Sequence, residues 1–252
     1  MTQKLYYQDS FLREFSASVL RCETAGDVWK VTLDRTAFYP EGGGQPADHG
    51  VLKTAAGEIA VTDVHEKDGE VIHTCAAPVE TGAAVSGAVD WNRRFDQKQQ
   101  HSGEHIISGI LCRLYHCDNV GFHLGAETVT IDYNAEITWE QALEAERLAN
   151  EAVLADRETE ITYPPPEALA ALEYRSKKEL TDRSALWNFR GRTAAPAAAP
   201  TWSGRGRWAL SRCSPARSSG RGSAWRFSAE PGRCAILAGF TTRPGLWASA
   251  SA

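Results

Sequence analysis

Short runs of alternating apolar and polar residues fill the first 90 positions of the chain, and turn-forming residues separate the runs. Val28–Leu33, Ile59–Thr62 and Val71–Thr74 are rich in residues that favour strands. Strands this short and frequent predict a small antiparallel β-barrel over residues 1–90. The glycines Gly42–Gly44 fall among these strands and predict a loop, because glycine adopts positive φ at no steric cost.

A helical period follows this strand-like segment. Apolar residues recur at helical spacing between Ile106 and Leu114, which predicts a helix over residues 97–115. At about 100° per residue, His101 and His105 fall on the side of this helix opposite the apolar stripe. We therefore expect the two imidazoles to face solvent, a second element or a cleft.

Further elements are expected beyond this helix. Val129–Tyr133 alternates like a strand, and Thr138–Gln141 has the sequence of a capping box that opens a helix to about Arg157. Ile161–Tyr163 predicts another strand, and Glu167–Glu173 predicts a short helix.

The charge of the chain is divided unevenly. Residues 1–183 hold 17 basic and 31 acidic residues, whereas the segment from Ser184 onward holds ten arginines, no lysine and one acidic residue. An acidic body offers no broad basic surface, so we expect no DNA partner and only local contact with RNA. Because the sequence has no N-terminal apolar segment and no apolar run of 18 residues, we expect a cytoplasmic protein without a membrane partner.

His101 and His105 have the spacing of a metal site, because side chains four residues apart lie on one face of a helix. A tetrahedral zinc site needs at least one more protein ligand. The last histidine of the sequence is His123, and only Cys213 and Cys234 follow it. The spacing therefore predicts half of a metal site.

Residues 184–252 have a composition of their own. Of these 69 residues 48 are Ala, Gly, Ser, Pro or Arg, and none is Val, yet five of the eight tryptophans lie here. Neither a packed domain nor an ordinary disordered tail has this composition. Our hypothesis is that a GC-rich gene is read out of frame from between about Thr181 and Ala185. A close relative whose own protein carries the same tail would contradict it.

The shifted frame can be read from the codons themselves. When the last base of each codon is joined to the first two of the next, Leu186–Trp202 is compatible with V-E-F-P-G-A-D-C-C-A-C-C-G-T-H-V. This reading is one of several that the free third bases permit. It contains a Cys-x3-His pair, which would supply the ligands that His101 and His105 lack.

Four motifs occur in a fixed order in residues 1–183: F-Y-P-E-G-G-G-Q-P-A-D-H-G at 38–50, Q-Q-H-S-G-E-H at 99–105, V-G-F-H-L-G at 120–125 and Y-R-S-K-K at 174–178. Together they resemble the free-standing alanyl-tRNA editing proteins of the AlaX type, which are relatives of the editing domain of alanyl-tRNA synthetase. Any one motif alone would be a weak signal.

The resemblance implies an α+β fold and a domain organisation. We expect an N-terminal β-barrel domain at 1–90, an incomplete two-layer α/β editing domain at 91–183, and an aberrant, disordered tail at 184–252. The resemblance also implies hydrolysis of the ester that joins serine or glycine to the alanine tRNA. In that family His-x3-His and a later Cys-x3-His bind one zinc ion, and the residues that should follow Asp182, that second pair among them, have no counterpart here.

The same resemblance assigns roles to single residues. His101 and His105 match the first pair of zinc ligands, and zinc is the expected cofactor. The expected partner is the acceptor end of the alanine tRNA, with Lys177 and Lys178 meeting its phosphates. The residues expected to approach that end are Gly43, Gly44 and Gln45.

Three other functions stay open at this point. His101–His105 also fits H-x-x-E-H, a zinc peptidase signature in which Glu104 would be the general base. The Arg-, Trp- and Gly-rich tail could bind single-stranded RNA by charge and stacking. The chain could also be an inert pseudogene product. ATP chemistry is not expected, because the sequence contains no P-loop.

Overall fold

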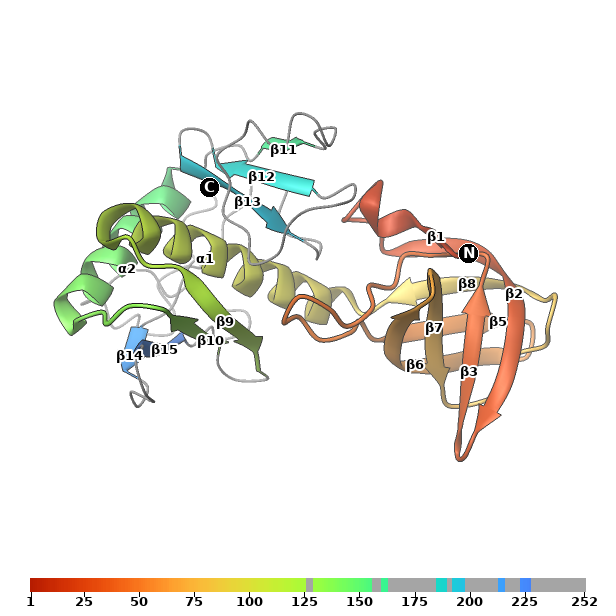
Figure 1. Ribbon diagram of the computed structural model, residues 1–252. Helices are drawn as coiled ribbons and strands as arrows, with labels where there is room; N and C mark the ends of the chain where they lie inside the picture. The colour runs from red at the N-terminus through yellow and green to blue at the C-terminus, as the bar shows by residue number, and fades with distance from the viewer. Residues whose placement is uncertain are drawn as a thin grey trace, which may run out of the picture. The chain divides into compact units, whose positions relative to one another are not determined.

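The computed structural model describes residues 1–125 and 129–155 and five short strands beyond them (Figure 1). The chain divides into two compact units. The first unit comprises residues 1–102 and 159–203, and the second comprises residues 103–158 and 204–252. One long helix, α1 (Trp91–Tyr115), runs through the division.

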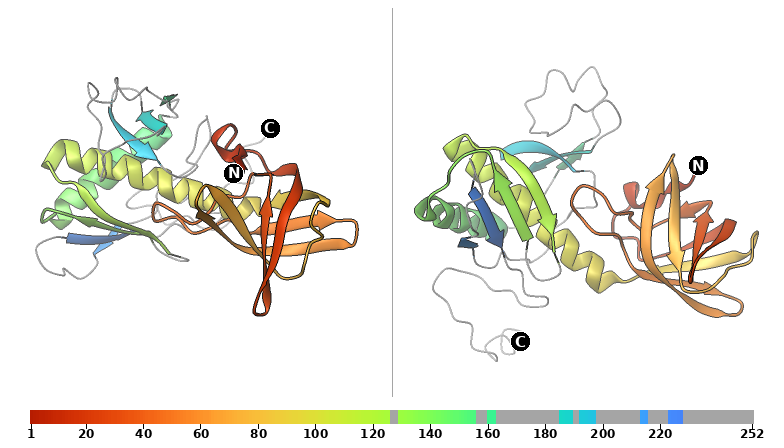
Figure 2. Two further views of the ribbon diagram at one scale, coloured as in Figure 1. Left: turned by 45° about the vertical axis from the view of Figure 1, so that its right-hand side comes forward. Right: turned by 60° about the horizontal axis from the view of Figure 1, so that its bottom comes forward.

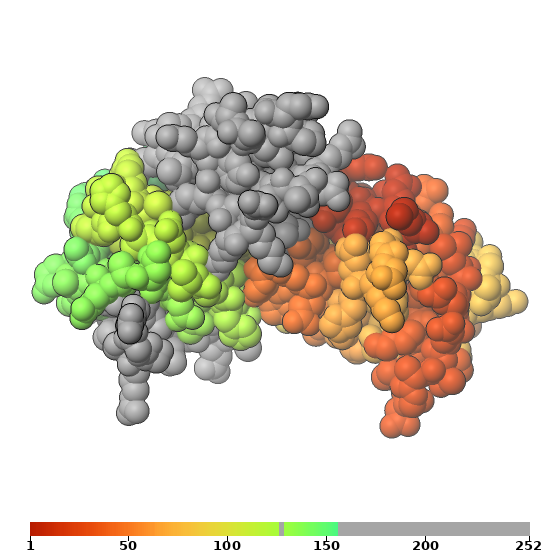
Figure 3. Space-filling model, in the orientation of Figure 1, coloured from red at the N-terminus to blue at the C-terminus, as the bar shows by residue number. Residues whose placement is uncertain are grey.

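The first unit contains a closed six-stranded antiparallel barrel, which confirms the barrel expected from the sequence. Strand β2 closes it by pairing with β8, with Phe15 opposite Gly87. The β2–β3 hairpin projects beyond its neighbours (Figures 1 and 3). In barrel order the strands are β2 (Glu14–Ala25), β3 (Val28–Leu33), β7 (Glu70–Cys75), β6 (Gly57–Lys67), β5 (Gly50–Thr54) and β8 (Ala84–Val89).

Three short elements adjoin the barrel. Strand β1 (Gln3–Lys4) pairs in parallel with β4 (Arg35–Thr36). Between β1 and β2 lies the 3-10 helix η1 (Leu5–Tyr7). These elements lie beside the segment that carries the triple glycine, because β4 leads directly into it.

The barrel interior is filled by the alternate residues of each strand, as expected for a sheet with one buried face. Phe38 lies at its centre, with its ring 5.7 Å from that of Phe15 and edge-on to it. Gly50 begins β5 where that strand approaches β8 most closely: a Cβ at Gly50 would lie 2.1 Å from the carbonyl oxygen of Ala88. Only glycine fits at this position, and it is the last residue of the first motif.

His73 is the one histidine buried inside the barrel among the described residues, with no exposed surface. Its Nδ1 lies 3.0 Å from the carbonyl oxygen of Val31, and its Nε2 lies 2.8 Å from the hydroxyl of Thr36. Because a carbonyl only accepts, Nδ1 carries the proton and Nε2 accepts from Thr36. Burial lowers the pKa of His73 to about 4, so the ring is neutral in the folded protein at neutral pH.

His73 should make the barrel less stable in acid. Between pH 6.5 and 4 the unfolded chain takes up a proton at this position and the folded chain does not, so stability falls as the pH falls. The full loss is about 3 kcal/mol for a shift of this size. Urea titrations across this pH range should show a shallower slope in His73→Gln, whose amide can donate to Val31 and accept from Thr36. Equal slopes for wild type and His73→Gln would contradict the assignment, and the exposed His65→Gln is the control.

The second unit has the expected two-layer arrangement, with one layer of helices and one layer of strands. Strands β9 (Asn119–Leu124) and β10 (Val129–Tyr133) pair antiparallel. The later half of α1 and helix α2 (Trp139–Leu154) lie on one side of this pair (Figure 2). Alternate residues of β10 are buried against the helices: Val129, Ile131 and Tyr133.

The helices confirm most of what the sequence predicted. The capping box at Thr138 and Gln141 is formed and opens α2, which ends at Leu154 rather than near Arg157. Helix α1 begins six residues before the predicted start. The signal for this start is Asp90, whose side chain accepts a hydrogen bond from the backbone N–H of Arg93.

Five short strands lie in the remainder of the chain. Strand β11 (Glu160–Thr162) covers most of the strand expected there, while Tyr163 and the helix expected at Glu167–Glu173 lie outside the described residues. Four strands fall within 184–252, and the rest of that segment is also outside the described residues. These four are β12 (Ala185–Phe189), β13 (Arg192–Ala197), β14 (Cys213–Pro215) and β15 (Ser223–Phe227).

These strands form two small sheets. One has the order β11-β12-β13, and in the other β14 and β15 continue from β10 and β9. In the part of the chain that the structure describes, no helix is both long enough and apolar enough to cross a membrane.

Candidate functional site

The triple glycine forms a tight turn. The backbone N–H of Gly42 donates to the carbonyl of Gln45 and the N–H of Gln45 donates to that of Gly42, both at 3.1 Å. Gly43 and Gly44 have φ of 62° and 82°, the positive values that a two-residue turn of the I′ kind requires. Both are exposed, whereas Gln45 is 1% exposed. The turn therefore presents backbone outward and directs the glutamine inward.

Gln45 joins the glycine turn to helix α1. Its Oε1 lies 3.0 Å from Nδ1 of His101, a residue 56 positions later and 4% exposed. Because an amide oxygen only accepts, Nδ1 of His101 carries the proton and Nε2 keeps its lone pair. Nε2 of Gln45 is buried and has no hydrogen-bond partner among the described residues. It can donate to an acceptor atom of a ligand at this place.

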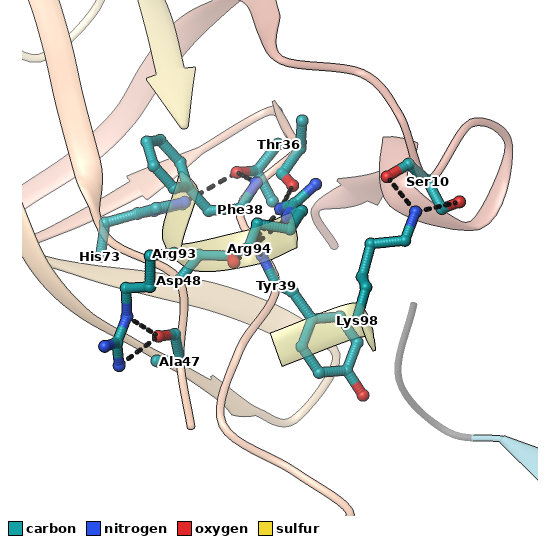
Figure 4. A network of polar contacts seen from close by, with 11 residues as sticks. Ser10, Thr36, Phe38, Tyr39, Ala47, Asp48, His73, Arg93, Arg94 and Lys98 are labelled. Atoms are coloured by element: carbon teal, nitrogen blue, oxygen red, sulfur yellow. Dashed lines mark hydrogen bonds and ion pairs between the residues drawn. The ribbon is translucent and has the colours of Figure 1, made fainter. Parts of the chain in front are cut away.

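A buried ion pair holds the loop that leads into β5 against α1 (Figure 4). The guanidinium of Arg94 donates to both carboxylate oxygens of Asp48 and to the carbonyl of Ala37. Asp48 also accepts from the backbone N–H of Tyr39 at 2.5 Å. Neither charged side chain is more than 1% exposed. Asp48 therefore fixes Gln45 relative to α1, a role that the sequence analysis did not assign.

Lys98 makes a second contact between α1 and the rest of the chain, here with the N-terminal segment (Figure 4). Its Nζ donates to the carbonyl and to the hydroxyl of Ser10 at 3.1 and 3.0 Å, and lies 3.7 Å from the centroid of the Phe11 ring. Burial lowers the pKa of Lys98 to about 7, and the charge of Arg94 adds to this effect. The ε-amino group of Lys98 therefore loses its proton near neutral pH. Its contacts hold α1 against the N-terminal segment at Ser10 and Phe11.

The two candidate zinc ligands lie on consecutive turns of α1 together with Glu104. One ligand atom from each of His101, Glu104 and His105 lies within 4.8 Å of the others. His105 is 11% exposed at its side chain, and its Nδ1 lies 3.4 Å from Oε2 of Glu104. The sequence predicted that the histidines face solvent, a second element or a cleft. His101 faces a second element, because it contacts Gln45 in the loop before β5.

One Cys-x3-His spacing does occur in the described residues, at Cys112 and His116. Cys112 follows His105 by seven residues on α1, which is about 10 Å along the helix axis. Zinc bonds are about 2.0–2.3 Å long, so Cys112 cannot share an ion with His101 and His105.

The structure brings together the candidates Gln45 and His101, and His105 follows His101 by one turn on α1. Lys177 and Lys178 lie outside the described residues. Sequence reasoning missed Asp48 and Arg94. Asp48 lies within the first motif, but the sequence around Arg94 is polar and gives no signal that this arginine is buried.

Comparison with known proteins relates the chain first to a class of tRNA synthetases and then, more narrowly, to an alanyl-tRNA editing protein and to alanine–tRNA ligases. Residues 6–93 match the family model of class II (A) tRNA synthetases. The chain is 39% identical over 159 residues to alanyl-tRNA editing protein AlaX-L of Pyrococcus horikoshii, covering 62% of this chain and 39% of that protein. It is 39% identical over 170 residues to alanine–tRNA ligase of Pyrococcus abyssi, covering 65% of this chain and 18% of the ligase.

A third relative agrees: alanine–tRNA ligase of Pyrobaculum neutrophilum is 41% identical over 165 residues. The matched part of the chain is therefore similar to AlaX-type editing proteins and to alanyl-tRNA synthetase, in agreement with the motifs. The chain spans about two fifths of the length of the editing protein and less than a fifth of the length of the ligases.

Proposed function

We propose that this chain derives from a trans-editing hydrolase that removes serine, and also glycine, from mischarged alanine tRNA. The observation that carries the proposal is the hydrogen bond between Gln45 and His101, because it joins the glycine turn and the His-x3-His helix in one place. The relatives named for alanyl-tRNA editing and alanine–tRNA ligase support it. Gly43 and Gly44 would meet the acceptor end of the tRNA through their exposed backbone, and Lys177 and Lys178 its phosphates.

An editing reaction is needed because binding alone does not discriminate well enough between alanine and serine. A pocket built for the methyl group of alanine cannot strongly reject serine, which adds only a hydroxyl, so a second hydrolytic site is needed. Hydrolysis of the ester requires an attacking water and stabilisation of the negative charge that forms on the carbonyl oxygen. Nε2 of Gln45 would donate to a substrate oxygen, and its burial without a hydrogen-bond partner among the described residues supports this role.

The residues present fit one half of a zinc site. Hydrogen bonding of Nδ1 leaves Nε2 of His101 as the atom that can bind a metal, and His105 lies one turn further on the same face. A bound zinc would polarise the ester or activate water. Cys112 and His116 cannot complete this site, and we propose that the missing Cys-x3-His pair was lost with the reading frame after about Thr181.

The peptidase alternative is less well supported. As general base Glu104 would need a carboxylate oxygen available to a water molecule. Its Oε1 instead accepts hydrogen bonds from Ser108 and Asn119 at 2.6 and 2.5 Å, and its Oε2 lies against His105. These contacts are typical of a carboxylate that orients its neighbours.

The proposal is tested with two proteins: the chain as written and a version whose frame is restored after Thr181. Both are incubated with seryl- and alanyl-tRNA of the alanine type, and release of the amino acid is measured. We expect the restored chain to hydrolyse seryl-tRNA in preference to alanyl-tRNA, and the chain as written to be much slower. A restored chain that leaves seryl-tRNA intact, or that cleaves a generic peptide instead, would refute the proposal.

A further inference from the structure

Glu104 is an acidic side chain with little access to water. It lies in the later half of α1, within the second unit, and its side chain is 6% exposed. A buried carboxylate is costly unless hydrogen bonds compensate it. A carboxylate this enclosed must therefore be held by specific donors.

Two donors from different elements hold one of its oxygens. The hydroxyl of Ser108, one turn further along α1, donates to Oε1 of Glu104 at 2.6 Å. Nδ2 of Asn119, the first residue of β9, donates to the same oxygen at 2.5 Å. Helix and strand therefore fix this oxygen from two directions.

A third side chain continues the network. The hydroxyl of Tyr133 lies 3.0 Å from that of Ser108, and both side chains are buried. Ser108 has a single hydroxyl proton and gives it to Glu104, so the proton in this contact comes from Tyr133. The order of donation is therefore Tyr133 to Ser108 to Glu104, which links β10 to α1.

The other oxygen of Glu104 faces the next residue. Oε2 lies 3.4 Å from Nδ1 of His105. A carboxylate at this position favours the ring form with its proton on Nδ1 and leaves the lone pair on Nε2. Metal-binding histidines commonly have such a carboxylate behind them, and its loss weakens metal binding about 10–100-fold.

We propose that Ser108, Asn119 and Tyr133 are positioning residues that hold Glu104 against His105, so that His105 presents its Nε2 to a metal ion. This inference deepens the proposed function and rests on it for the identity of the metal. The network itself is a property of the metal-free chain. It makes Glu104 an orienting group, and Gln45 plays the corresponding part for His101.

The test reads the ring form of His105 directly in the zinc-free, 252-residue chain. Histidine labelled with ¹⁵N is observed at about pH 8, above the ordinary histidine pKa of about 6.5. In the wild type, we expect His105 to carry its proton on Nδ1. In Ser108→Ala and Asn119→Ala, we expect a mixture of the two ring forms. Tyr133→Phe, which keeps the ring and removes only the hydroxyl, should show a smaller change in the same direction.

Internal and external controls separate this effect from unfolding. His101 should keep its proton on Nδ1 in all three variants, because Gln45 holds it. Ser86→Ala on β8 and Tyr115→Phe at the end of α1 remove the same groups outside the network and should leave His105 unchanged. Identical His105 signals in wild type, Ser108→Ala and Asn119→Ala, with His101 unchanged, would overturn the proposal.

Zinc binding then distinguishes this inference from the proposed function. This measurement uses the frame-restored chain. Competition with a coloured chelator should show about 10–100-fold weaker zinc binding in the restored Ser108→Ala variant than in the restored parent. If the restored parent binds no zinc and the ring form of His105 still depends on Ser108, the network stands and the zinc-dependent function fails. If zinc binds equally well to the restored parent and its Ser108→Ala variant, the positioning role is refuted and the proposed function is not.

Discussion

Asp48→Ala should lower the free energy of unfolding by about 3–5 kcal/mol, because it leaves the guanidinium of Arg94 buried without its counter-ion. Neither side chain of this pair is more than 1% exposed, and Arg94 spans from α1 to the loop at Ala37. The loss is measured by urea titration of the full chain, followed by circular dichroism. A change below about 1 kcal/mol would contradict the burial of the pair.

Two controls isolate the cause of this loss. Glu14→Ala removes one partner of the exposed pair between Glu14 and Lys53, and should cost no more than about 1 kcal/mol. In Asp48→Ala with Arg94→Met, the second substitution removes the orphaned charge. The double variant should therefore be more stable than Asp48→Ala alone. If the two losses simply add, the residues do not act as a pair.

His101→Ala in the frame-restored chain should weaken zinc binding by at least about 100-fold, since a direct ligand matters at least as much as an outer partner whose loss costs 10–100-fold. Hydrolysis of seryl-tRNA should fall with it. Gln45→Leu removes the hydrogen bond to Nδ1 of His101 and should lower zinc affinity by about 10–100-fold. Zinc content by mass spectrometry and chelator competition measure both effects.

The matched control for these variants is His123→Ala, which removes an exposed histidine on β9. It should retain zinc and activity. A restored chain that binds zinc equally well with and without His101 would show that the ion is held elsewhere. If zinc binding is weaker in His101→Ala but unchanged in Gln45→Leu, His101 is a zinc ligand and only the orienting role of Gln45 is refuted.

Local patterns predicted most of the secondary structure, because they act over a few residues. The alternation in Val28–Leu33 and Val71–Thr74 and the capping box at Thr138 each appear as the expected element. The start of α1 was placed too late, because the apolar stripe begins only at Ile106 and the polar first half has no helical period. Asp90 was the correct signal, and it acts through a single hydrogen bond.

The contacts that build the candidate site could not be read from the sequence. Motif and spacing selected Gln45 and His101 separately, but their hydrogen bond joins residues 56 positions apart. Asp48 and Arg94 are 46 positions apart, and their pairing follows only once the barrel places the loop beside α1. Strand β9 also escaped prediction, since Gly121 interrupts a short run that reads as a loop. Long-range contacts of this kind depend on the fold as a whole.

The closed barrel has a practical consequence for work on this protein. All six of its strands lie between Glu14 and Val89, so every backbone bond of the sheet is made by residues encoded before the helix is reached. An alteration to the gene downstream of that point removes none of those bonds. Good yield and a strong β-sheet signal would therefore not distinguish the chain as written from the frame-restored chain, and the two should be compared by zinc content and by release of serine from seryl-tRNA.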